Sequence, residues 1–282
     1  MAAITSSALF SLSKTYILLS GIAGTNPHHA TLGSVAFAKF CVQVDLQLEL
    51  GARETPCDWQ SGYVPLGAAS QSSQPSEHHG TEVFELNEAL RDVAFRIACE
   101  VGLQDSEQAN RFRQRFEQKH STDYYEAATA PPCVLRGDVV SSNVWFHGRD
   151  LSNDMARAAQ TYTHSRASYV MTAMEDTGVL AALLRAAVEN KVDFARVVLM
   201  RAASNFDRPP PDHDGAVELP FRLDSGGLEP ALRNLYLVGA RLVRELLDGW
   251  DQFEHGVEAE NYIGDVFGSL GAEPDFLKPP LV

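Results

Sequence analysis

SYVMTAMEDTGVL, residues 168–180, joins a short strand to a helix and places acidic side chains where the two meet. The strand is expected from Ala167 to Thr172. The helix is expected from Glu175 to Asn190, because apolar residues recur on one face at helical spacing: Val179, Leu180, Leu183, Leu184 and Ala187. Strands that alternate with helices build an α/β fold, and Glu175 stands at the start of such a helix.

Two further strands are predicted on either side of this segment. The run from Lys14 to Ser20 is short and apolar, and it leads into a Gly-rich turn, Gly21 to Pro27. Asp193 to Met200 has β-branched residues between charged ends, which predicts a buried strand that delivers Ser204-Asn205. Because open α/β sheets bind ligands beyond the carboxyl ends of their strands, the Gly-rich turn is a candidate binding segment.

The rest of the chain continues the alternation of strands and helices. Alternating apolar and polar residues predict a long strand over Gly33 to Leu50, and helical spacing predicts a helix over Thr81 to Ala98 with Asn87 as a possible cap. Residues 51–80 are rich in Pro, Gly, Ser and Gln, which predicts a mobile surface insertion. An amphipathic helix is expected from Ala231 to Gly249. This pattern favours a largely parallel sheet in one domain.

Composition restricts the partners. The 282 residues are 45% hydrophobic, enough to bury a full core. A net charge of −14 repels nucleic-acid phosphates and anionic lipid, so neither nucleic acid nor a membrane is an expected partner. No apolar run reaches the length of roughly 20 residues that a spanning helix needs, so we expect a cytoplasmic protein, with secretion as the alternative. The four cysteines lie far apart and the common cofactor motifs are absent, so no metal and no cofactor are expected.

Five blocks in order resemble the fungal purine nucleoside permease family, which is itself similar to the nucleoside phosphorylase and nucleosidase superfamily. The blocks are KTYILLSGIAGTNP (14–27), ATLGSVAFA (30–38), GTEVFELNEAL (80–90), YVMTAMED (169–176) and RAASNFDRP (201–209). The resemblance implies a single nucleoside phosphorylase-like α/β domain over residues 1–282, with a mixed central sheet flanked by helices. The superfamily's first strand and helix precede the Lys14 strand, so we expect this chain to lack that N-terminal portion.

The resemblance also implies where a nucleoside would bind. The turn Gly21, Ile22, Ala23 and Gly24 would lie against the ribosyl centre, while Met174 and Glu175 would lie under the sugar. A carboxylate has two acceptor oxygens for a vicinal diol, and a thioether is a polarisable floor. On the residues alone, Glu175 is equally well explained as a helix-start carboxylate that interacts with the helix dipole.

The base would be contacted from two other segments. Asn205 stands where the superfamily carries an acid or amide that hydrogen-bonds purine N7, and its NH2 group could stabilise charge on the departing base. Asp207 is the substitute acid, or else only a turn carboxylate before Arg208-Pro209. Trp145 and Phe146 could stack on the purine, and core packing explains them equally well.

By this resemblance the protein would cleave the N-glycosidic bond of purine nucleosides, with water rather than phosphate as nucleophile, because no cationic phosphate cradle surrounds Gly21. Asn205 and Asp207 would be the catalytic residues. A homo-oligomer is also implied. One alternative is a nucleoside-binding protein without catalysis, or a scaffold reused for another small metabolite, since a fold does not fix chemistry. Transport is a third possibility and would require a membrane partner.

Overall fold

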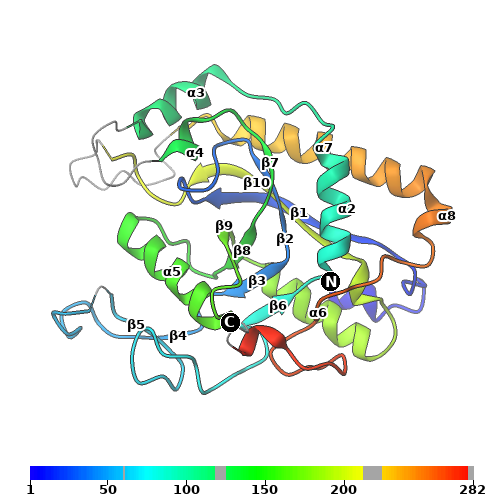
Figure 1. Cartoon of the computed structure of the whole chain (residues 1–282), viewed down its shortest axis with the longest axis horizontal. Helices are drawn as coiled ribbons and strands as arrows, with labels where there is room; N and C mark the ends of the chain where they lie inside the picture. Colours follow the sequence, from blue (N-terminus) through cyan, green and yellow to red (C-terminus); the bar gives the residue numbers. More distant parts are fainter. Residues whose placement is uncertain (60, 118–124, 212–223, 279–282) are drawn as a thin grey trace.

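An eight-stranded sheet forms the centre of the computed structural model, which describes residues 1–59, 61–117, 125–211 and 224–278 (Figure 1). The strand order is β6-β3-β8-β9-β1-β10-β2-β7. The strands are β1 Ile17–Thr25, β2 Val35–Ala38, β3 Phe40–Gln43, β6 Val83–Glu85, β7 Val134–Arg136, β8 Asp138–Ser141, β9 Tyr169–Ala173 and β10 Val197–Phe206. A small separate sheet pairs β4 Gln47–Glu49 with β5 Tyr63–Pro65.

Helices pack around the large sheet. They are α1 Ala2–Thr5, α2 Glu88–Ala98, α3 Glu107–Arg113, α4 Glu126–Thr129, α5 Arg149–Tyr162, α6 Asp176–Val188, α7 Leu228–Asp248 and α8 Trp250–Phe253. Short 3-10 turns cover Gln114–Phe116, Phe194–Arg196 and Asp275–Leu277. The predicted class, an α/β fold with a mixed central sheet flanked by helices, is confirmed. The extent of the domain, residues 1–282, stays a prediction.

The sheet is mixed, and the relative directions of its strands differ from those that the sequence pattern indicated. β1 runs parallel to β10, whereas β9 is antiparallel to β1 and β2 is antiparallel to β10. The expectation of a largely parallel sheet was therefore wrong in its centre. The reason is that alternation of strands and helices does not fix strand direction, because a long connection that contains a helix can lead to a parallel or to an antiparallel strand. The pairing of β1 with β10 also contains a register shift between Ala23 and Gly24.

Strand β10 shows why both faces of the sheet are buried. Successive side chains of a strand point to opposite faces, so β10 supplies two cores at once. Val197, Leu199 and Ala203 belong to the core that α6 covers. Val198, Met200 and Ala202 belong to the core that α2 and α7 cover. Figure 1 shows α6 on one side of the sheet and α2 with α7 on the other. A strand buried on both faces reads as a nearly continuous apolar run, and β10 does so from Val197 to Met200, before Arg201.

Several predicted element boundaries moved. The predicted Gly-rich turn is wrong in its first part, because β1 continues through Gly21 to Thr25. The predicted long strand over Gly33 to Leu50 is divided into β2, β3 and β4. The predicted helix over Thr81 to Ala98 begins only at Glu88, after strand β6. Asn87 is confirmed as its cap, since its side-chain Oδ1 accepts a hydrogen bond from the Leu90 N–H at 3.1 Å.

Residues 51–80 form mostly turns and bends around β5, apart from residue 60, which lies outside the described residues. The mobility predicted for this insertion stays a prediction.

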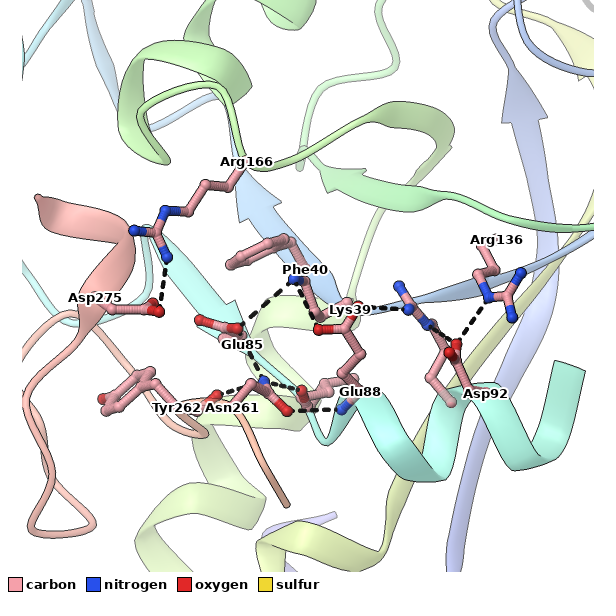
Figure 2. A network of polar contacts seen from close by, with 12 residues as sticks. Lys39, Phe40, Glu85, Glu88, Asp92, Arg136, Arg166, Asn261, Tyr262 and Asp275 are labelled. Atoms are coloured by element: carbon pink, nitrogen blue, oxygen red, sulfur yellow. Dashed lines mark hydrogen bonds and ion pairs between the residues drawn. The ribbon is translucent and has the colours of Figure 1, made fainter. Parts of the chain in front are cut away.

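The C-terminal segment is attached to the sheet edge at β6 through a buried carboxyl group (Figure 2). Glu85 is only 1% exposed, and its backbone exchanges two hydrogen bonds with Gly264 at 2.9 and 3.0 Å. Its Oε1 accepts from Asn261 Nδ2 at 2.8 Å, and Lys39 Nζ lies 4.0 Å away. Farther along, Asp275 pairs with Arg166 at 2.7 Å. Burial is the main reason why the pKa of Glu85 is raised to about 7.

Candidate functional site

A pocket of about 230 Å³ lies where β1 and β10 approach their carboxyl ends and β9 runs into α6. The strands bring together segments that are far apart in sequence. The lining residues are Ile22, Ala23, Gly24, Ser142, Val144, Trp145, Phe146, Thr172, Ala173, Met174, Glu175, Arg201, Ser204 and Asn205. Eight of the ten residues predicted from the sequence are in this set. Gly21 and Asp207 are outside it.

The wall formed by β1 depends on two glycines. A β-carbon on Gly24 would lie 2.7 Å from Thr172 Cγ2 and 3.2 Å from Asn205 Nδ2. A β-carbon on Gly21 would lie 2.3 Å from Nη1 of Arg201. Glycine at these positions therefore lets neighbouring side chains cross the face of β1. Gly21 contributes to the site indirectly, by leaving space for Arg201.

Met174 and Glu175 stand at the junction of β9 and α6. Both are exposed, with Met174 at 44%, and the Ser141 hydroxyl holds the Met174 carbonyl at 3.0 Å. Glu175 occupies the N-cap position of α6, but its side chain makes no capping hydrogen bond. The Glu175 carboxylate therefore does not cap α6 in this structure. Its oxygens remain available to a ligand with hydroxyl donors.

A buried ion pair lies directly beside Glu175, and sequence reasoning gave it no role. Arg201 donates from Nε to Asp176 Oδ2 at 3.0 Å, and a second, shorter contact joins its other nitrogen to Oδ1. Asp176 is fully buried, and Arg201 also reaches the Ile22 carbonyl at 3.3 Å. The available signal was a charged residue inside the apolar strand β10, which requires a partner when it is buried. Because the carboxylate balances the guanidinium, the pair adds no net charge to the pocket.

The side-chain amide of Asn205 is held in one orientation. The Ser204 hydroxyl lies 3.0 Å from Asn205 Oδ1 and 3.1 Å from the Ala23 carbonyl. Asn205 Nδ2 donates to the Phe206 carbonyl at 3.1 Å. Within the described ranges this is the one acceptor recorded for Nδ2, which carries two hydrogens. A donor with a fixed direction is therefore available on the β10 side of the pocket.

The two aromatic residues after β8 differ in environment. Phe146 is buried and packs edge-to-face on Tyr169, with ring centroids 6.5 Å apart. Trp145 is 47% exposed at the pocket. Phe146 is thus part of the core as well as the pocket wall, and Trp145 places an indole ring, a group that can stack on a planar ligand, at the pocket.

Asp207 lies outside the pocket in a buried polar cluster. It is 1% exposed, accepts from Arg208 Nε at 2.7 Å and accepts from the Tyr169 hydroxyl at 2.7 Å. Its backbone carbonyl accepts from Gly148 and from Ser152 at the start of α5. This cluster joins the end of β10 to α5. The structure therefore places Asp207 in a framework position, with both carboxylate oxygens already hydrogen-bonded.

Comparison with solved structures found partial similarity at low identity. A methylthioadenosine/S-adenosylhomocysteine nucleosidase from Neisseria meningitidis is 18% identical, with 87% of this chain and 74% of that chain covered and a TM-score of 0.43. A futalosine hydrolase from Helicobacter pylori is 17% identical, with 87% and 75% covered and a TM-score of 0.45.

Closer similarity was found among fungal sequences. A protein of Candida albicans named purine nucleoside permease is 38% identical over 285 residues, which cover 99% of this chain and 68% of that protein. A probable purine nucleoside permease of Schizosaccharomyces pombe is 33% identical over 258 residues, which cover 88% of this chain and 71% of that protein.

These names correct two predictions made from the sequence. The relatives are named as permeases, which points to transport and overturns the predicted cleavage of the N-glycosidic bond. The predicted cytoplasmic localisation is overturned by the same finding. The physical reason for the first error is that side chains suited to holding a sugar and a base can serve binding without bond cleavage.

Among the residues that the structure describes, no helix has both the length and the apolar composition required to cross a bilayer.

The model of the purine nucleoside permease family matches residues 1–258, which is most of the chain. The ordered blocks that first suggested this resemblance all lie inside the match, and the resemblance is confirmed at 38% identity to a named member. The chain belongs to the purine nucleoside permease family.

Proposed function

We propose that this chain binds purine nucleosides in the pocket between β1, β9 and β10 and takes part in their transport. Family membership supports the ligand class and the transport role. The observation that carries the proposal is the uncapped Glu175 carboxylate beside Met174, across the pocket lining from the fixed amide of Asn205.

Each pocket segment suits one part of a nucleoside. Glu175 accepts hydrogen bonds from the two sugar hydroxyls, and Met174 packs under the sugar ring. The Ile22 to Gly24 segment, which has almost no side-chain bulk at Ala23 and Gly24, lets the backbone approach the sugar closely. Asn205 donates to an acceptor nitrogen of the purine, and Trp145 stacks on the base. Asp207 does not contact the nucleoside and acts only through the buried polar cluster that joins the end of β10 to α5.

Electrostatics favours a nucleoside over a nucleotide. Arg201 is neutralised by Asp176, so Glu175 leaves the pocket with net negative charge. The whole chain carries −14. A neutral ligand with hydroxyl donors is therefore attracted, while a phosphorylated one is repelled.

Binding and transport can be tested together. Isothermal titration calorimetry of the full chain should show saturable binding of adenosine, inosine or guanosine, with the nucleoside recovered intact, and much weaker binding of adenosine 5′-monophosphate. Fungal cells that lack their own nucleoside uptake should gain uptake of labelled nucleoside when they express the chain. Glu175→Gln should weaken binding about tenfold, the loss typical of a charge-assisted hydrogen bond. Glu189→Gln, at the exposed far end of α6, is the matched control.

Two outcomes would contradict the proposal. Absence of binding to all three nucleosides, together with unchanged uptake, removes both of its parts. Release of free base during the titration would remove the transport role in favour of chemistry at the bond.

A further inference from the structure

Residues 142–146, called the 142–146 segment below, form one side of the pocket without belonging to a strand or a helix. The segment lies between the end of β8 and the start of α5, and its residues Val144 and Trp145 are exposed at the pocket. The hydrogen-bond ladders that order strands and helices therefore do not order this part of the wall. Its position depends on the side chains that hold it.

Asp45, which follows β3 by two residues, holds the 142–146 segment at Asn143. Asp45 Oδ2 accepts hydrogen bonds from the Asn143 backbone N–H at 2.8 Å and from Asn143 Nδ2 at 3.1 Å. Because both donors belong to one residue, the carboxylate fixes the direction of the backbone as well as that of the side chain. Hydrogen bonds to an ionised carboxylate are also stronger than neutral ones.

Asp45 itself has a fixed place beside the end of β8. The preceding residue, Val44, donates its backbone N–H to the Ser141 carbonyl at 3.0 Å, and the Asp45 carbonyl accepts from the Gln47 N–H at 3.0 Å. Asp45 Oδ1 is buried and has no hydrogen-bond partner among the described residues. A buried acceptor without a donor costs free energy, so the two bonds from Asn143 are what stabilises this carboxylate. Each of the two residues therefore keeps the other in place.

A local turn transmits the position of Asn143 to Trp145. The Ser142 hydroxyl donates to the Val144 carbonyl at 2.6 Å and accepts from the Val144 N–H at 3.1 Å, so Asn143 stands in the middle of a turn that Ser142 closes. In the part of the chain that the structure describes, Asp45 is the one group outside the segment that hydrogen-bonds Asn143 or Val144. The direction in which this turn presents Trp145 therefore depends on Asp45.

We propose that Asp45 is a positioning residue of the pocket, which places the indole of Trp145 through its two hydrogen bonds to Asn143. The inference rests on the proposed function, because Trp145 is the side chain that we assign to the purine. A loop that is ordered before the ligand arrives loses less freedom on binding, so the hold on Trp145 contributes to affinity. Because two side-chain hydrogen bonds make this hold, a single substitution should release it.

A double-mutant cycle tests whether Asp45 acts through Trp145. In calorimetry with inosine, Trp145→Ala should raise the dissociation constant about tenfold, within the range of a base stacked on an aromatic ring. Asp45→Ala should raise it about threefold, because the segment must then be ordered by the ligand. The double variant should bind as Trp145→Ala alone does. Asp45→Ala combined with Glu175→Gln should instead show the product of the two losses, because Glu175 is assigned to the sugar.

Tryptophan fluorescence tests the placement without a ligand. The chain has three tryptophans, so Trp59→Phe with Trp250→Phe leaves Trp145 as the single emitter. In this background Asp45→Ala should lower the fluorescence anisotropy of Trp145 and raise its quenching by acrylamide. Asn143→Ala, which removes one of the two bonds at an exposed residue, should change both readings in the same direction and by less. Asp45→Asn keeps a side-chain oxygen as acceptor and should restore both readings and the affinity.

Glu54→Ala is the control, because Glu54 is an exposed acid that follows β4 and lies outside the pocket lining. It should change neither affinity nor fluorescence, and thermal melting should show that all variants are folded. Unchanged affinity or unchanged fluorescence in Asp45→Ala overturns the proposal, as does a double variant weaker than Trp145→Ala by the full Asp45 factor. If the wild type binds no nucleoside, the proposed function fails, and the fluorescence comparison alone decides whether Asp45 places Trp145.

Discussion

Gly21 and Arg201 are register partners on the parallel strands β1 and β10, and the guanidinium of Arg201 occupies the space where a Gly21 side chain would begin. The distance from that missing β-carbon to Nη1 is 2.3 Å, far below van der Waals contact. The guanidinium cannot move aside freely, because Asp176 holds it through two hydrogen bonds. The wall of the pocket is therefore set by a glycine that does not line it.

Gly21→Ala should push Arg201 away from Asp176 and destabilise the protein. Because the contact breaks a buried ion pair, we expect the free energy of unfolding to fall by about 3 kcal/mol, measured by urea denaturation. Nucleoside affinity should fall as well. Gly178→Ala in α6 is the control: a β-carbon there meets nothing within 4 Å, so helix propensity should make it neutral or slightly stabilising. Equal losses in both variants would contradict this explanation.

Asp176→Asn should be more harmful than removing the whole pair. It leaves the Arg201 charge buried with a weaker partner, a change that costs about 3–5 kcal/mol when a buried pair is broken. Combining Asp176→Leu with Arg201→Met removes both charges and should recover part of this loss. Urea denaturation of the single and double variants measures the difference. A double variant that is less stable than either single one would disprove the account.

Stability should decrease as the pH rises through the range in which Glu85 ionises. Burial raises the folded-state pKa of this carboxyl from 4.5 to about 7, so the folded protein binds the proton more tightly than the unfolded chain does. The contribution of Glu85 to the free energy of unfolding is therefore largest below pH 4.5 and decreases until about pH 7, by about 3 kcal/mol. Glu85→Gln should remove most of the dependence.

Urea denaturation between pH 5 and pH 8 measures the effect of Glu85. Glu258→Gln, an exposed position in the same C-terminal segment, is the control and should keep the wild-type pH profile. If Glu85→Gln follows the wild type across this range, Glu85 is not the group responsible.

Asn205→Asp should convert a donor in the pocket into a charged acceptor. The new carboxylate lacks the N–H that we assign to the purine, and it adds negative charge to a pocket that already contains Glu175. We expect nucleoside affinity at pH 8 to fall at least tenfold, about 1.4 kcal/mol, with partial recovery at pH 5. Calorimetry at both pH values is the measurement. Asn190→Asp, exposed beyond α6, should bind as the wild type does.

Local patterns predicted the elements whose signals are local. Asn87 begins α2 as a cap because its side chain needs only the N–H three residues later. The apolar run that ends at Met200 is the first part of β10. The strand continues to Phe206 because the buried charge of Arg201 is balanced by Asp176 of α6. Continuation of a strand through a charge cannot be predicted without knowing that partner.

The sequence predicted which segments come together in one pocket. Met174, Glu175 and Asn205 meet in one pocket because strand order brings β9 and β10 to opposite sides of β1. Asp207 could not be separated from them by sequence, because it follows the last residue of β10, where the strand alternation ends, and its side chain pairs with Arg208 instead of lining the pocket. Function depended on the relatives, because the same contacts serve binding and bond cleavage alike.

The pairing of β1 with β10 continues across the register shift between Ala23 and Gly24, and this limits which parts of the pocket can move. Paired residues on β1 and β10 extend on both sides of the shift, from Ile17 with Val197 to Thr25 with Phe206, so we expect the two strands to move together as one rigid unit. The pocket residues of the two strands cannot separate without breaking the hydrogen bonds between β1 and β10. The rim segments, Ser142 to Phe146 and the β9–α6 junction, have fewer such bonds. We therefore expect any opening and closing of the pocket around a nucleoside to occur at the rim, while the wall formed by β1 and β10 stays in place.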